Sequence, residues 1–197
     1  MSEFRRRLLM QSKSELPSGY TRLAYIEANG GQRLNTNVGF SETKIICDCQ
    51  GQIELTGTQL LVSPGSSAAG FWFGTANKVY TGGSGAVFNE IPSNNRISVY
   101  IEFSKWDTTN DTIFRINGIE KTRRRGSASF SYPICLSNID YMVYAKYYSL
   151  VIKDFSDNIL FNGIPAIDSN GNVGLFDTIT QQLFQSETSS QFIAGYE

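Results

Sequence analysis

TIFRINGIEKTR, the stretch from Thr112 to Arg123, has the clearest hairpin pattern in the chain. Its centre is Asn117-Gly118, a pair that readily adopts the two positive φ angles of a type I′ turn. Runs rich in strand-forming residues flank the pair on both sides. We therefore predict a β-hairpin with strands at Thr112–Ile116 and Ile119–Arg123.

The pattern of strands and turns continues on both sides of this hairpin. Apolar residues alternate with polar ones from Ile97 to Phe103, which is the period of a strand with one buried face. Gly70–Gly74 and Tyr141–Lys153 are rich in aromatic and β-branched residues, and glycine, asparagine and serine gather between such runs. We predict an all-β fold in which two antiparallel sheets form a jelly-roll sandwich.

Length and composition indicate one folded domain preceded by a short basic arm. The chain has 197 residues, of which 41% are hydrophobic and 13% aromatic, and this is enough for a single globular core. Residues 1–15 carry an excess of positive charge, so we expect an arm there and the sandwich domain at 16–197. Phe4, Leu8 and Leu9 could form the apolar stripe of a short helix that is stable only when docked.

The residues that are missing or rare exclude several kinds of chemistry. The chain has no histidine, which excludes histidine-based nucleophiles, histidine-ligated metals and histidine pH switches. The odd number and the spacing of Cys47, Cys49 and Cys135 do not fit a disulfide framework or a zinc site, so we expect buried thiols. The paired carboxylates that a retaining glycosidase of this fold needs are not found either. We predict that the protein is not an enzyme and has no cofactor.

The charge and hydropathy of the chain limit the kinds of partner that the protein can bind. A net charge of -1 argues against nucleic acid and against an anionic membrane surface. The apolar run Leu8–Met10 is too short for an export signal, so we expect a soluble chain that is not exported. Asp107–Asp111 and Asp168–Asn170 hold oxygen ligands that calcium could use. We interpret both as polar turns and predict no metal site.

Two longer segments resemble a known family. LPSGYTRLAYIEANGGQRLNTNV (Leu16–Val38) is similar to the opening, and AKYYSLVIKDFSDNILFNGIPAIDSNGNVGLFDTITQQLFQSETSSQFIAGYE (Ala145–Glu197) to the closing pattern, of concanavalin A-like (LamG-like) jelly-roll proteins from gut bacteria and Bacteroides-type phages. MSEFRRRLLM (Met1–Met10) resembles the start of related phage proteins. The resemblance implies a concanavalin A-like sandwich in a bacteriophage virion structural protein. A departure is Arg33–Asn37, where the family commonly has Tyr-Ile-Asp-Thr-Gly.

Two basic clusters supply the candidate docking residues. These candidates are Phe4, Arg5, Arg6, Arg7, Leu8, Leu9, Arg123, Arg124 and Arg125. Guanidinium groups suit the carboxylates of an acidic neighbour, although the second cluster could also be a solvated edge that prevents strand pairing. With the resemblance, these residues predict a capsid-decorating or auxiliary head protein. Its partners would be major capsid or other head or tail proteins, and it would be a homo-oligomer in the virion, made in the cytoplasm of the bacterial host.

Carbohydrate binding is the alternative function. The domain would then be a lectin-like attachment module of a phage fibre or tail, or a bacterial surface adhesin. Glycan sites on sandwiches use exposed aromatic rings with amides and acids around them. The candidates are Trp106, Tyr80 and Asn94, with Tyr100 and Trp72 also considered. Trp72, which lies between two phenylalanines, could instead pack in the core.

Overall fold

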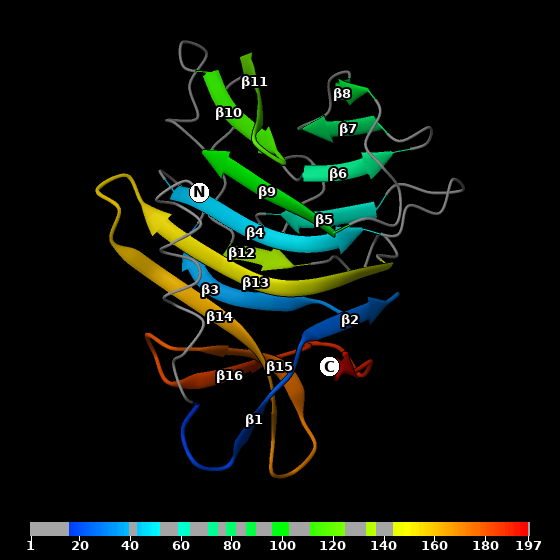
Figure 1. Cartoon of the computed structure of the whole chain (residues 1–197), viewed down its shortest axis with the longest axis vertical. Coiled ribbons are helices and arrows are strands. Elements are labelled where there is room, and N and C mark those ends of the chain that lie inside the picture. Colours follow the sequence, from blue (N-terminus) through cyan, green and yellow to red (C-terminus); the bar gives the residue numbers. More distant parts are fainter. Residues whose placement is uncertain are drawn as a thin grey trace.

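The computed structural model describes residues 16–39, 43–51, 59–63, 71–74, 78–81, 86–89, 96–102, 111–124, 133–136 and 144–196. Within these residues the regular structure is β-strand, arranged in two antiparallel sheets (Figure 1). The predicted all-β sandwich is therefore confirmed. The arm at 1–15 lies outside the described residues. Nowhere in the described part is there a helix with the length and hydropathy of a membrane span.

The larger sheet, here called the large sheet, contains eleven strands and runs in the order β11-β10-β9-β4-β13-β14-β15-β16, with β1, β2 and β17 paired beside this path. Its strands are β1 (Tyr20–Arg22), β2 (Tyr25–Asn29), β4 (Thr43–Gly51), β9 (Arg96–Glu102), β10 (Asp111–Ile116), β11 (Ile119–Arg124), β13 (Tyr144–Asp154), β14 (Ile159–Asp168), β15 (Val173–Asp177), β16 (Gln182–Gln185) and β17 (Ile193–Gly195).

The second sheet, here called the small sheet, has the order β3-β12-β5-β6-β7-β8 and lies behind the large sheet in Figure 1. Its strands are β3 (Leu34–Gly39), β5 (Gln59–Ser63), β6 (Phe71–Gly74), β7 (Lys78–Thr81), β8 (Ala86–Asn89) and β12 (Pro133–Leu136). In both sheets, strands that are distant in the sequence become neighbours, as in β9-β4-β13. Such long-range neighbours are the mark of Greek-key and jelly-roll topologies.

The core lies between the sheets and follows the period of two residues predicted from the sequence. Ile97, Val99 and Ile101 of β9 are buried, with exposed fractions of 0–1%, and the residues between them point outward. Leu34 of β3 and Leu136 of β12 enclose the core from the small sheet. Each such side chain contributes about 1.5–3 kcal/mol by burial, which makes the core the main source of stability.

The hairpin predicted at Asn117-Gly118 is also confirmed. β10 and β11 pair up to Ile116 opposite Ile119, and Asn117 and Gly118 have φ angles of 51° and 85°. These are the two positive values of a type I′ turn.

Two further hairpins share one turn design. In the turn between β14 and β15, the Asp168 carboxylate accepts hydrogen bonds from the backbone N–H groups of Asn170 and Asn172 and from the Asn172 amide. Asp154 and Asn158 make the equivalent contacts between β13 and β14. Hydrogen bonds from Asn172 hold the pKa of Asp168 below its usual value. Both oxygens of Asp168 are thus engaged inside the turn, in line with the polar-turn interpretation.

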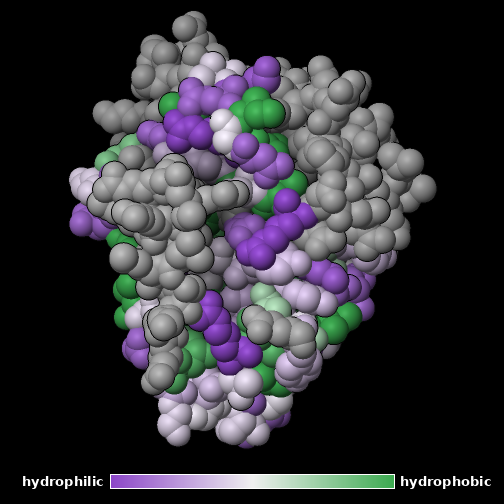
Figure 2. All heavy atoms as spheres, viewed as in Figure 1, coloured by the Kyte–Doolittle hydropathy of each residue, from purple (hydrophilic) through white to green (hydrophobic). Residues whose placement is uncertain are grey.

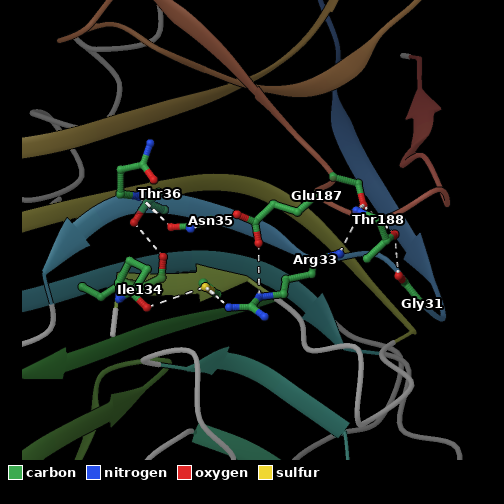
Figure 3. Close-up of polar contacts among 11 residues, drawn as sticks. Gly31, Arg33, Asn35, Thr36, Ile134, Glu187 and Thr188 are labelled. Atoms are coloured by element: carbon green, nitrogen blue, oxygen red, sulfur yellow. Dashed lines mark hydrogen bonds and ion pairs between the residues drawn. The ribbon is translucent and has the colours of Figure 1, made fainter. Parts of the chain in front are cut away.

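A polar seam joins the two sheets where β3 meets the turn after β16 (Figure 3). The backbone N–H of Glu187 donates to the Arg33 carbonyl at 2.7 Å, and the Arg33 N–H donates to the Ser186 hydroxyl. The Glu187 carboxylate also binds Arg33 Nε at 3.4 Å and the Asn35 amide at 2.9 Å. Arg33 and Asn35 are positions where the chain departs from the family pattern, and both serve this seam.

Cys135 of β12 lies beside the seam. Its Sγ is 3.6 Å from the Arg33 guanidinium, and burial raises the pKa of the thiol. The prediction of a buried thiol is confirmed for Cys135, whose exposed fraction is 0%. Cys47 and Cys49 belong to β4, of which the structure describes the backbone at those positions.

The Arg33–Glu187 pair is expected to couple the sheets weakly. We expect Arg33→Ala and Glu187→Ala to be non-additive in a double-mutant cycle, with a coupling of about 0.5–1 kcal/mol because both side chains are partly solvated. Urea unfolding of the two single variants and the double variant measures this coupling. Strict additivity would contradict a direct interaction.

Candidate functional site

A band of aromatic and charged side chains crosses the outer face of the large sheet. Burial of Ile97, Val99 and Ile101 directs Arg96, Ser98 and Tyr100 outward, because side chains alternate along a strand. Neighbouring strands β10, β4, β13 and β2 add side chains to the same face. This face is turned toward the viewer in Figures 1 and 2, and Figure 2 shows mostly polar residues along its middle, with apolar ones among them.

The first group of contacts, here called the Tyr100 cluster, consists of Tyr100, Glu102, Arg115 and Glu120. The Tyr100 hydroxyl donates to Glu102 Oε2 at 2.6 Å, and the Arg115 guanidinium lies 4.5 Å from the centre of the Tyr100 ring. Arg115 Nε also binds Glu120 at 2.7 Å. Burial, followed by the hydrogen bond to Glu102, raises the pKa of Tyr100 to about 12. The phenol therefore stays protonated and keeps a fixed orientation.

The second group, here called the Tyr148 cluster, contains Asp48, Arg96 and Tyr148, together with Tyr25, Lys146 and Glu27. Arg96 donates from Nε and Nη2 to the two oxygens of Asp48 at 3.2 and 2.5 Å. The carbon of the same guanidinium lies 3.8 Å above the Tyr148 ring centre. The hydrogen bond with Asp48 raises the pKa of Arg96. This geometry is a two-pronged ion pair stacked on an aromatic ring.

A β-bulge explains why Tyr148 belongs to this face. The register between β13 and β4 shifts between Tyr147, opposite Cys49, and Ser149, opposite Asp48. Tyr148 is the extra residue, and the shift lets both Tyr147 and Leu150 point into the core. Bulges commonly re-aim a side chain next to a functional site.

Tyr25 and Lys146 complete the Tyr148 cluster. The Tyr25 ring is tilted against Tyr148, with centroids 5.6 Å apart. Lys146 Nζ lies 4.4 Å from the Tyr25 ring centre and 3.8 Å from Glu27 Oε2. A hydrogen bond with Tyr25 raises the pKa of Lys146. A Cβ atom at position 195 would overlap the Tyr25 ring, so Gly195 of β17 allows the ring to lie against the backbone.

The band offers a particular set of interactions. Tyrosine rings provide apolar surface, and beside them lie carboxylates that accept and guanidinium or ammonium groups that donate hydrogen bonds. Most of these side chains are already held by a neighbour, so little further ordering is needed on binding. Among the described residues, no three cysteine, aspartate or glutamate side chains are close enough to hold a metal ion. The arrangement suits an uncharged ligand rich in hydroxyl groups.

The structure describes some of the candidate residues predicted from the sequence and not others. Trp106, Asn94, Arg125 and the arm residues Phe4, Arg5, Arg6, Arg7, Leu8 and Leu9 lie outside the described residues. For Tyr80, Arg123 and Arg124 the structure describes backbone positions: Tyr80 of β7 pairs with Trp72 of β6, and the two arginines end β11. Tyr100 is the aromatic candidate that falls within the band.

Sequence reasoning missed Asp48, Arg96, Tyr148 and Tyr25. The alternation in β9 could have indicated an outward Arg96, but nothing in the local sequence shows which strands lie beside it.

Comparison with known proteins shows a similar fold in a solved structure. Neither a family model nor a curated protein sequence matches the chain. The structure is similar to the crystal structure of a "putative carbohydrate binding protein" from Bacteroides ovatus ATCC 8483, with a TM-score of 0.58. The match covers 89% of this chain at 9% sequence identity.

The two proteins share a fold. At this sequence identity the similarity concerns the fold alone. The matched region spans 61% of the Bacteroides ovatus protein. The concanavalin A-like family that the sequence resembles stays a prediction.

Proposed function

We propose that this protein is a non-catalytic carbohydrate-binding module that holds glycans on the outer face of its large sheet. The observation that carries the proposal is the Tyr148 cluster, in which a guanidinium–carboxylate pair is stacked on an aromatic ring. The carbohydrate-binding description of the structural neighbour supports the same function. The sequence supports the non-catalytic part, because it lacks histidine and the carboxylate motif of a glycosidase.

The chemistry of a sugar matches both parts of this cluster. The C–H face of a pyranose ring is apolar and can pack against a tyrosine ring, while its hydroxyl groups both donate and accept hydrogen bonds. Asp48 would accept from one hydroxyl and Arg96 would donate to the next. Ligand sites commonly combine apolar surface with a few fixed polar groups in this way.

Glycan binding can be tested with the full chain on a glycan array and then by calorimetry. We expect Tyr148→Ala to weaken the binding of the selected glycan at least about tenfold, or about 1.4 kcal/mol, whereas Tyr148→Phe keeps most of the affinity because the ring remains. The matched control is Phe155→Ala, which removes an aromatic ring from the turn between β13 and β14. Equal affinities of the Tyr148→Ala and Phe155→Ala variants, or no glycan bound by the unaltered protein, would refute the proposal.

A virion is the setting in which we place this activity, on the strength of the sequence resemblance. Attachment to glycans and incorporation in a phage particle are compatible roles, since a phage can hold its host through such a module. Docking through the arm residues Phe4 to Leu9 and through Arg123, Arg124 and Arg125, homo-oligomerisation and a capsid-decorating position stay sequence-based predictions. The arm and Arg125 lie outside the described part of the chain, and for Arg123 and Arg124 the structure describes backbone positions.

A further inference from the structure

We infer that the ligand is an uncharged, extended glycan that runs along β9 from the Tyr148 cluster to the Tyr100 cluster. This inference rests on the proposed function and specifies its ligand class. It is carried by the ion pairing of the cations in the two clusters and by the spacing and size of the side chains along β9.

Each cation of the two clusters already has a carboxylate partner. Arg96 pairs with Asp48 at 2.5 Å, Arg115 with Glu120 at 2.7 Å and Lys146 with Glu27 at 3.8 Å. A uronate or sulfate group could bind Arg96 only by competing with a two-pronged carboxylate. It would then leave Asp48, whose side chain is 22% exposed, without its cation, and this is costly at a partly buried site.

A fourth carboxylate, Glu102, has lysines in its register row. It accepts a hydrogen bond from the Tyr100 hydroxyl and stands opposite Lys44 of β4. Lys153 of β13 follows Lys44 in the same row. The cations of the two clusters, each paired with a carboxylate, attract a further anion only weakly, while the polar atoms of the band can still bind hydroxyl groups.

The spacing of the clusters sets the length of the ligand. Tyr100 and Arg96 are four residues apart in β9, which corresponds to about 13 Å along a strand. A few linked sugar rings cover that distance, whereas a single ring does not. Between the clusters stands Ser98, which is exposed and small enough for a glycan chain to pass over it.

The charge part of the inference is tested by comparing neutral gluco- and galacto-oligosaccharides with oligogalacturonates of the same lengths. We expect the neutral series to bind at least about tenfold more tightly. We also expect its affinity to change less than about twofold between low salt and about 0.5 M NaCl, because no net charge is neutralised on binding. Tighter binding of the uronates, or an affinity that falls steeply with salt, would overturn this part.

The length part is tested with Tyr100→Ala beside Tyr148→Ala. We expect Tyr148→Ala to weaken every glycan, and Tyr100→Ala to weaken hexasaccharides about tenfold but disaccharides hardly at all. Phe155→Ala again serves as the control, and melting curves show that each variant is folded. Equal losses for short and long glycans in Tyr100→Ala would overturn the extended mode while leaving the proposed function intact. No binding of any glycan by the unaltered protein would overturn both.

Discussion

Gly174→Ala is expected to destabilise the protein by about 3 kcal/mol or more, which could prevent folding altogether. Gly174 lies in β15 between β14 and β16 and pairs with Gln185. A Cβ atom there would overlap the carbonyl oxygen of Phe184 and lie 2.8 Å from its carbonyl carbon. These are backbone atoms of the paired strand, so they can move only if the ladder between β15 and β16 opens.

Urea unfolding followed by tryptophan fluorescence or circular dichroism measures this effect. The matched control is Gly39→Ala, because a Cβ atom at the end of β3 would meet no atom of the described residues within 4 Å. We expect the control to change the free energy of unfolding by less than about 0.5 kcal/mol. Similar stabilities for the Gly174→Ala and Gly39→Ala variants would contradict the close approach of β15 and β16.

Asp177→Ala is expected to cost about 3–5 kcal/mol. Asp177 has an exposed fraction of 0% and ends β15. Its carboxylate accepts hydrogen bonds from the backbone of Asn162 at 2.8 Å and of Thr180 at 3.0 Å, and from the Thr180 hydroxyl at 2.7 Å. Alanine would take the acceptor away from these part-buried donors, and β14 would lose one of its ties to the turn after β15.

The control for this prediction is Asp168→Ala. The Asp168 carboxylate accepts three hydrogen bonds, against four for Asp177, and its side chain is only half-buried, so water can replace it more easily. We therefore expect a clearly smaller loss of stability than for Asp177→Ala in the same urea titration. Equal losses would mean that burial does not decide the contribution of Asp177.

Local patterns predicted the fold well because local physics decides them. Asn117-Gly118 requires only its own φ angles to form a hairpin, and the alternation in β9 requires only one buried face. The polar turn at Asp168–Asn170 likewise depends on its own short side chains. Each of these features can be predicted from a few neighbouring residues.

The candidate site could not be predicted in the same way, because its residues come from distant parts of the chain. Asp48, Arg96 and Tyr148 meet only because β4 lies between β9 and β13. The bulge in β13 also decides which face Tyr148 belongs to, and its sequence gives no sign of a bulge. Arg33 is a further example: the sequence shows only that this position departs from the family pattern, and the structure assigns Arg33 to the seam between the sheets.

The position of β13 also affects the order in which the chain can fold. The meander from β13 to β16 consists of neighbouring hairpins, so each pairing closes a short loop at a small entropic cost. β2 and β4, by contrast, reach β13 from the other end of the chain, and contacts over such separations slow folding. We therefore expect the C-terminal meander to form first, and the N-terminal strands, which bring Asp48 and Tyr25 to the site, to pair with its edge later.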